Sequence, residues 1–151
     1  MSFWNSLKIG ASALTAQRLR LDIISNNIAN AETTRTETGE PYKRKDVVFA
    51  DQNSNNFLPQ LIKSLRGDTS STSTNMAGVK VESIETDESE GSLVYDPTHP
   101  DANEEGYVEY PNVNLVVEMT NMLSATRSYE ANLSTIEAAK RMAQKALEIG
   151  K

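Results

Sequence analysis

The sequence predicts an α+β fold, with long N- and C-terminal helices that form an antiparallel, coiled-coil-like pair and a small β-rich, loop-rich middle segment. Three observations predict it. Apolar residues recur every seven positions near the N-terminus, and five apolar heptads occupy the C-terminal part. Between them, short alternating runs are separated by prolines and glycines. At 151 residues the chain has the length of one domain.

We expect the N-terminal helix within residues 1–32. Four of its apolar residues fall at seven-residue spacing, which places them on one side of a helix, and a fifth reinforces that side. The four are Leu7, Leu14, Leu21 and Ile28, and the fifth is Ile24. The serine and asparagines that follow Ile24 compete for helical backbone hydrogen bonds, so the helix should end near Ala31.

We expect the C-terminal helix within residues 113–151, where it would be roughly 50 Å long. Asn112 or Asn114 can cap its start, and Gly150 can close its end. Lys140 interrupts an otherwise continuous heptad row. The residues of that row are Leu115, Met119, Met122, Thr126, Tyr129, Leu133, Ile136, Ala143 and Leu147.

The middle segment, residues 33–112, is predicted to contain short strands. Two runs, 46–50 and 78–84, are rich in β-branched and aromatic residues. Two weaker candidates lie at 93–95 and 107–110. Turn residues separate these runs, so the sequence predicts a small β-rich region.

A longer stretch separates the first two strand candidates. Residues 57–65 have the spacing of one short amphipathic helix. Within the stretch near residues 66–77, the tract 68–75 is wholly polar and has no apolar residue to bury, so we expect the stretch to be mobile.

Composition argues against catalysis and against bound cofactors or metals. The chain has no cysteine, which excludes thiol nucleophiles, disulfides and cysteine-based zinc sites. The only histidine, His99, lies between two prolines in a short run that is better explained as a structural turn than as a metal site. The acids at 85–90 lack the spacing of a calcium loop. We therefore expect neither enzyme activity nor a cofactor.

Charge and hydropathy argue against nucleic-acid binding, a membrane span and a cleaved signal peptide. Residues 82–109 hold ten of the 21 acids and no Lys or Arg, which leaves 15 basic and 11 acidic residues elsewhere. That excess of four is too small and too scattered for nucleic-acid binding. No apolar run reaches the roughly 18 residues of a membrane span. The N-terminus lacks the apolar core of a cleaved signal peptide.

The two terminal helices carry few charges for water-facing helices. Between Met119 and Ile136 only Arg127 and Glu130 are ionic, and the other faces carry small or polar residues. Such helices are typical of an assembly in which other protein surrounds them. Both apolar rows are therefore predicted assembly interfaces. The alternatives are a coiled-coil adaptor and a metal-binding module.

Several motifs resemble a known family. The run Ser25–Ala31 (SNNIANA) after an amphipathic helix resembles the signature of bacterial flagellar axial proteins. Many of these continue into Thr-Pro-Gly-Tyr, whereas this chain continues with Glu32–Thr36 (ETTRT), a departure that resembles the proximal-rod subfamily of basal-body rod proteins. The runs 78–81, 95–102 and 106–114 are similar to that subfamily as well. The signature residues are Asn26, Asn27, Ala29, Asn30, Pro97, His99, Pro100, Gly106, Tyr107, Pro111 and Asn112.

This resemblance implies a structural subunit that polymerises into the helical tube of the flagellar proximal rod and transmits torque across the periplasm. It implies export by the flagellar type III apparatus without a cleaved signal. The implied partners are copies of the chain itself, other proximal- and distal-rod proteins and the adaptor at the export gate, with no direct membrane span. The terminal helices would form the tube-core domain, and the middle segment would pack outside it.

Overall fold

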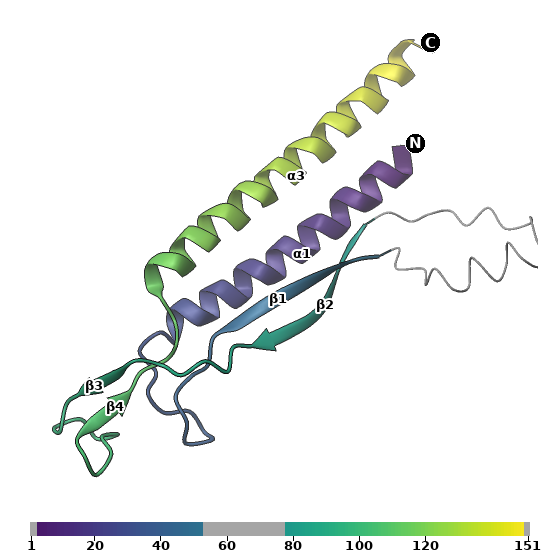
Figure 1. Cartoon of the computed structure of the whole chain (residues 1–151). Coiled ribbons are helices and arrows are strands. Elements are labelled where there is room, and N and C mark those ends of the chain that lie inside the picture. Colours follow the sequence, from purple (N-terminus) through teal and green to yellow (C-terminus); the bar gives the residue numbers. More distant parts are fainter. Residues whose placement is uncertain (1–2, 53–77, 150–151) are drawn as a thin grey trace, which may run out of the picture.

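The computed structural model describes residues 3–52 and 78–149. Its two long helices, α1 (Phe3–Ala29) and α3 (Leu115–Ile149), run antiparallel, so the start of α1 and the end of α3 lie at the same end of an elongated molecule (Figure 1). The predicted fold class, α+β with terminal helices and a small β-containing middle, is confirmed.

The strands form two separate antiparallel pairs among the described residues. β1 (Lys45–Asp51) and β2 (Val79–Thr86) make a ribbon that lies along α1, on the side away from α3 (Figure 1). β3 (Leu93–Tyr95) and β4 (Tyr107–Glu109) form a hairpin at the opposite end of the molecule from the chain termini. All four strands were predicted from the sequence.

The two strand pairs differ in how much they bury. A β-bulge between Val48 and Phe49 interrupts the β1–β2 register, as is common where a ribbon must curve. In the β3–β4 hairpin, Val108 is buried, whereas the rings of Tyr95 and Tyr107 pack edge to face on its exposed side at 5.2 Å between centroids. The hairpin therefore keeps one open, partly apolar side.

An asparagine side chain sets the start of α3. The side-chain oxygen of Asn114 accepts hydrogen bonds from the backbone N–H groups of Val116 and Val117, at 3.0 and 3.2 Å. Asn114 is therefore the N-cap of α3. At the end of α1, Asn30 donates from its backbone N–H to the carbonyl of Asn26. The helix ends two residues before the predicted Ala31.

The seam between α1 and α3 is offset from the predicted pairing. The inner row of α3, Met122, Tyr129, Ile136 and Ala143, is half-buried on the side that faces α1. The residues buried beside it on α3 are Glu118, Ala125 and Ala139. The heptads predict that the leucine row of α1 packs against the Met119–Ile136 row and that neighbouring subunits cover the apolar surface left over. In the lone chain, Met119 and Leu133 of that row stay exposed. Small side chains take the central positions because they let the two helices approach closely.

On α1 the leucine row is only half-buried, although this helix has two neighbours. α3 covers one side of α1 and the β1–β2 ribbon covers another. The deepest residues of α1 include Ala16 and Ile24, at 3% and 4% exposure, and Gly10. A Cβ added to Gly10 would lie 2.7 Å from Cγ1 of Ile136, so a glycine is needed for this approach of the two helices.

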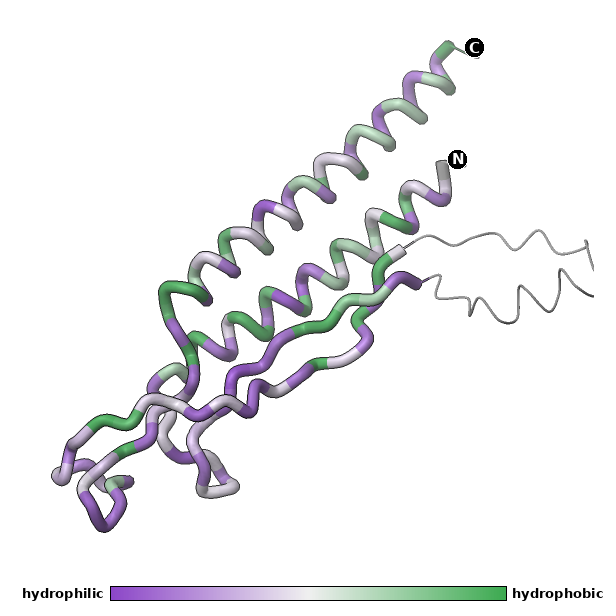
Figure 2. Tube along the Cα trace, in the orientation of Figure 1, coloured by the Kyte–Doolittle hydropathy of each residue, from purple (hydrophilic) through white to green (hydrophobic). Residues whose placement is uncertain are grey.

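Figure 2 shows a long apolar stretch at the start of α3 and shorter apolar stretches, alternating with polar ones, along the rest of the helix. The predicted helix at 57–65, the predicted mobile tract near 66–77 and the closing Gly150 lie outside the described residues.

Candidate assembly interface

A buried asparagine joins the two halves of the chain. The side chain of Asn27 is completely buried, and its amide makes four hydrogen bonds. Its Nδ2 donates to the backbone carbonyl of Lys45 at 2.7 Å and to the carboxylate of Glu118 at 3.1 Å. Its Oδ1 accepts from the Tyr42 hydroxyl at 2.9 Å and from the Lys45 N–H at 3.0 Å. This is the full capacity of an amide, so only Asn fits the position.

Glu118 is the charged partner at this site, with 1% of its surface exposed. Its Oε1 accepts from Nε of Arg44 at 3.0 Å and from the side chain of Asn121 at 3.3 Å. A carboxylate at such depth needs a counter-charge and hydrogen bonds, and the site supplies both.

Arg44 and Asn112 extend the network toward the loops. Burial opposes the charge of Arg44, but the hydrogen bond and the attraction of Glu118 outweigh it, so the pKa of Arg44 is raised. The backbone N–H of Arg44 donates to Oδ1 of Asn112 at 2.8 Å. Nδ2 of Asn112 donates in turn to the carbonyl of Asp87 and the hydroxyl of Ser89. Of the two predicted caps of α3, Asn112 therefore holds loops together instead.

Tyr42 completes what we call the polar junction, which consists of Asn27, Tyr42, Arg44, Asn112 and Glu118. Burial raises the pKa of the Tyr42 phenol, and the nearby Glu118 carboxylate raises it further. The junction fixes the end of α1, the start of α3 and the entry to β1 relative to one another.

The other signature residues near α1 contribute less to the lone chain. Asn26 and Ala29 are exposed. Asn30 is half-buried, and its Nδ2 donates to the carbonyl of Asn26 at 2.9 Å. Exposed positions within a signature motif are free to contact another subunit.

The signature residues of the β3–β4 region shape turns. Oδ1 of Asp96 accepts from the backbone N–H and the hydroxyl of Thr98, which lowers the pKa of Asp96. Nδ1 of His99 accepts from the N–H of Asp101 at 3.1 Å, as a turn residue does. Gly106 has a φ of +82°, a conformation that favours glycine. Pro97 and Pro100 are exposed in the same turn, whereas Pro111, just before α3, is buried.

The outer row of α3 is the half of the predicted interface that the lone chain does not bury. It consists of Leu115, Met119, Thr126, Leu133 and Leu147. Met119 is 59% exposed and Leu147 75% exposed, and only Thr126 is half-buried. Leu133 is 42% exposed. On the remaining surface of α3, Val116 and Leu123 are exposed as well. Exposed apolar side chains gathered at the start of α3, with Leu133 and Leu147 further along, mark a contact with other protein.

Sequence reasoning missed three members of the junction, Tyr42, Arg44 and Glu118. A signal for one of them was present, since Glu118 is the only ionic residue between Leu115 and Thr126. A single charge in an apolar helix start indicates a specific buried partner. The partner, Arg44, lies 74 residues away and carries no local pattern that would have identified it.

In the part of the chain that the structure covers, neither a cluster of metal ligands nor a membrane-spanning helix is found. No three acidic or histidine side chains there gather as a metal site would need. Neither described helix combines the length and apolarity needed to cross a bilayer.

Comparison with known proteins agrees with the motifs. Residues 7–35 match the family described as flagella basal body rod protein. Residues 104–149 match the C-terminal family described as flagellar basal body rod FlgEFG protein C-terminal. Each matched segment contains members of the polar junction, Asn27 in the first and both Asn112 and Glu118 in the second.

Relatives that match over almost their full length point to one kind of rod protein. The flagellar basal-body rod protein FlgC of Bacillus subtilis is 48% identical, with both chains covered completely. FlgC of Borreliella burgdorferi is 45% identical over 99% of this chain and 98% of its own length. FlgC of Salmonella typhimurium is 37% identical over 99% of each chain.

Proposed function

Because the chain belongs to the FlgC family of flagellar basal-body rod proteins, and is thus a structural rod subunit, we propose that it builds the proximal part of the rod. In this proposal copies of the chain and of other rod proteins polymerise into a helical tube that transmits torque across the periplasm. The chain acts as a structural element and has no catalytic role.

The observation that carries the proposal is the outer row of α3. A helix whose Met119, Leu133 and Leu147 all face outward leaves apolar surface that the chain cannot cover itself. Neighbouring subunits in the tube cover this row, and burial of a large side chain favours assembly by at most about 1.5–3 kcal/mol, in proportion to the surface that the lone chain leaves exposed. Many such contacts act together, so the tube resists twisting although each interface is modest.

The domain division follows from the same arrangement. We assign residues 1–32 and 113–151 to the tube core and residues 33–112 to a middle segment outside it. The half-buried leucine row of α1 contributes to the core together with both rows of α3. The polar junction holds the middle segment at a fixed angle to the core, because it bonds β1 and the loops to both helices.

The finer assignments concern partners and delivery. The neighbours are copies of the chain itself, the other proximal- and distal-rod proteins and the adaptor that joins the rod to the export gate. The flagellar type III apparatus exports the chain without cleaving a signal peptide. The comparisons contain nothing that favours the coiled-coil adaptor or the metal-binding module.

A replacement experiment tests the proposal. In a motile bacterium, Leu133→Asp as the only copy of the chain should abolish swimming and leave no rods in basal-body preparations, because a charge would have to be buried at a subunit contact. Leu133→Met, which keeps the apolar volume, should restore both. Since Leu133 is 42% exposed in the lone chain, the Asp variant should still fold. Normal rods from Leu133→Asp would contradict the outer row as an interface.

A further inference from the structure

The β3–β4 hairpin is held to the rest of the molecule less directly than the β1–β2 ribbon. The ribbon packs along α1, whereas in the described part of the chain no helix and no strand of the ribbon packs against the hairpin (Figure 1). Only loops place the hairpin, which projects from the end of the molecule opposite the chain termini. Its orientation therefore depends on the few bonds that these loops make.

The two connectors of the hairpin meet at Asn112. This residue lies between β4 and α3, and its Nδ2 donates to the carbonyl of Asp87 at 3.1 Å and to the hydroxyl of Ser89 at 3.0 Å, both between β2 and β3. Its Oδ1 accepts from the backbone N–H of Arg44 at 2.8 Å. Both connectors are thus tied at one point to the polar junction, and this point can serve as a pivot.

Beyond this pivot the hairpin, residues 92–110, is closed by its own bonds. The backbone N–H of Tyr110 donates to the carbonyl of Ser92 at 2.9 Å, beside the strands. The backbone N–H of Asp96 donates to the carbonyl of Gly106, also at 2.9 Å, and closes the turn that joins the strands. Because both ends of the hairpin are bonded internally, we expect it to move as one body.

The loop that follows α1 is closed in the same way. The backbone N–H of Tyr42 donates to the carbonyl of Thr33 at 3.1 Å. Within this span, the N–H of Thr36 donates to the carbonyl of Glu40 at 2.9 Å. Since Tyr42 also belongs to the polar junction, this loop is fixed relative to both helices. It forms the stationary side of any contact with the hairpin.

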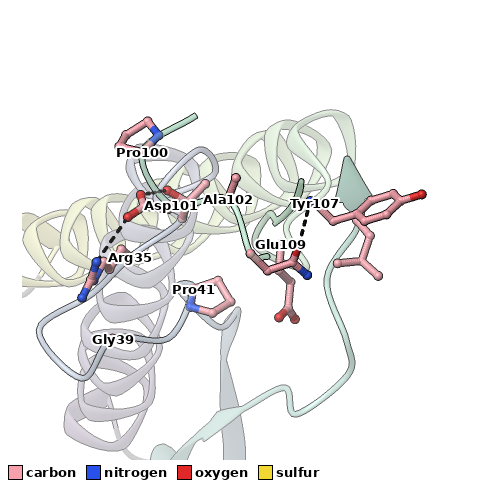
Figure 3. Close-up of a pocket in the computed structure, with 11 residues that line it drawn as sticks. Arg35, Gly39, Pro41, Pro100, Asp101, Ala102, Tyr107 and Glu109 are labelled. Atoms are coloured by element: carbon pink, nitrogen blue, oxygen red, sulfur yellow. Dashed lines mark hydrogen bonds and ion pairs between the residues drawn. The ribbon is translucent and has the colours of Figure 1, made fainter. Parts of the chain in front are cut away.

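One carboxylate joins the loop to the hairpin. Asp101, in the turn between β3 and β4, accepts from the hydroxyl of Thr34 at 2.8 Å and lies 3.6 Å from the guanidinium of Arg35 (Figure 3). Among the described residues, these are the only hydrogen bond and ion pair between residues 33–42 and the hairpin. A groove of about 340 Å³ opens beside them and separates much of the loop from the hairpin. We call these three residues the latch.

The latch provides the direction that apolar burial lacks. Val108 on β4 is buried, but apolar burial has no preferred direction. A hydrogen bond weakens steeply as its angle departs from linear. The bond from Thr34 to Asp101 therefore sets the angle of the hairpin, and the ion pair with Arg35 supports it.

We propose that Asp101 is a positioning residue that fixes the angle between the β3–β4 hairpin and the helix pair. When the latch opens, the hairpin swings about Asn112 as one body. The role of that angle rests on the proposed rod function, because the exposed rings of Tyr95 and Tyr107 then meet a neighbouring subunit in one orientation. A freely swinging hairpin loses entropy at each subunit contact, which weakens the contact.

Distances between two spin labels test the latch in the isolated chain, which has no cysteine of its own. Glu104→Cys on the hairpin turn and Glu130→Cys on α3, both exposed, carry the labels. With the latch intact, the distance distribution should show one narrow peak. Thr34→Val together with Arg35→Gln removes both partners of Asp101 without altering the hairpin, and should give a broad distribution.

The matched control pairs Glu82→Cys on the exposed surface of β2 with Glu130→Cys. Because the ribbon packs along α1, this pair should keep one narrow peak with the latch intact and with the latch removed. Broadening in the control as well would show that the whole chain had loosened, and would overturn a motion confined to the hairpin.

Single variants should rank the two contacts of the latch. Thr34→Val should raise the ratio of open to closed hairpins about ten-fold, as expected for loss of a hydrogen bond to a carboxylate. Arg35→Gln should raise that ratio about two-fold, since the guanidinium is mostly exposed. Thr34→Ser keeps the hydroxyl and should retain the narrow peak. A broad distribution in Thr34→Ser would contradict the role of the hydroxyl.

Proton NMR of the same variants shows whether the hairpin itself stays folded. The ring centroids of Tyr95 and Tyr107 lie 5.2 Å apart, so the two rings should give a cross-peak in every variant. Loss of the cross-peak together with a broad distribution would mean that the hairpin had melted, which would overturn a swing as one body.

Replacement in a motile bacterium tests the role of the angle in assembly. Thr34→Val with Arg35→Gln, as the only copy of the chain, should reduce swimming and the yield of rods, whereas Thr34→Ser should leave both unchanged. A narrow distribution in the double variant would refute the latch, whatever the cells do. Normal rods despite a broad distribution would refute the positioning role and leave the rod function intact. Absence of the wild-type chain from basal bodies would refute the proposed function, while the latch measured in the isolated chain would stand.

Discussion

The inward and outward faces of α3 differ in what covers them. The inward face buries Ala125 and half-buries Tyr129 and Ile136, whereas the outward face exposes Met119 and Leu147. An ordinary amphipathic helix places its largest apolar residues inside. Here both faces carry large apolar residues, and only one face is covered within the subunit. The difference indicates a chain whose apolar surface is divided between folding and assembly.

The two ends of the helix pair differ in a similar way. At the end near the β strands, the polar junction fixes α1 and α3 by hydrogen bonds and an ion pair. Toward the termini, the contact of Gly10 with Ile136 brings the helices together without such bonds. The polar junction therefore sets the relative direction of the two helices at one end, and the contact of Gly10 with Ile136 sets how closely they pack toward the other.

Aspartate placed on each face of α3 in turn should give the largest difference between the inward and outward faces. Ala125 is completely buried, so Ala125→Asp should lower the free energy of unfolding by at least ~3 kcal/mol. Leu133→Asp should change the free energy of unfolding of the isolated chain by less than about 1 kcal/mol. Urea unfolding followed by circular dichroism measures both. Equal losses for the two variants would break the distinction between the faces.

Loss of the buried carboxylate should have the next largest effect. Glu118→Ala removes the partner of Arg44 and of the Asn27 amide, and should cost about 3–5 kcal/mol in unfolding free energy. Glu130→Ala, on an exposed position of the same helix, should stay within about 0.5 kcal/mol. If Glu118→Ala proved as mild as its control, the junction would not be what orients the helices.

The smallest expected effect concerns the phenol of the junction. Tyr42→Phe should cost about 1 kcal/mol near pH 7, because the hydrogen bond to Asn27 is lost. The folded protein raises the pKa of Tyr42 above its ordinary value of 10.0, so this stabilisation is complete below that pH and is lost as the pH rises through the folded pKa. Unfolding measured at increasing pH should show the wild type approaching the variant above about pH 10. A constant difference across that range would contradict the burial of the phenol.

Much of this fold could be predicted from the sequence because its signals are local. Heptad spacing identified both helices, and β-branched runs identified all four strands. The offset of the α1–α3 seam could not be predicted, since an apolar row has the same spacing whether it faces a partner helix or another subunit. The close approach of Ile136 to α1 depends on Gly10, a glycine that a search for apolar residues passes over.

The polar junction was less predictable than the helices. Asn27 was recognised as part of a signature, but its four hydrogen bonds come from residues 15, 18 and 91 positions away. Hydrogen bonds over such separations leave no periodic pattern. Asn112 and Asn114 illustrate the same point, because both have the chemistry of a cap and only the folded chain assigns the cap to Asn114.

The most direct test of subunit assembly through the outer row is the accessibility of a thiol at position 133. Leu133→Cys should react rapidly with a maleimide in the isolated chain, where the native side chain is 42% exposed. In assembled basal bodies the same thiol should be protected, while a control thiol at exposed Glu82→Cys in the middle segment keeps reacting. Equal labelling of position 133 in the isolated chain and in the rod would contradict the account.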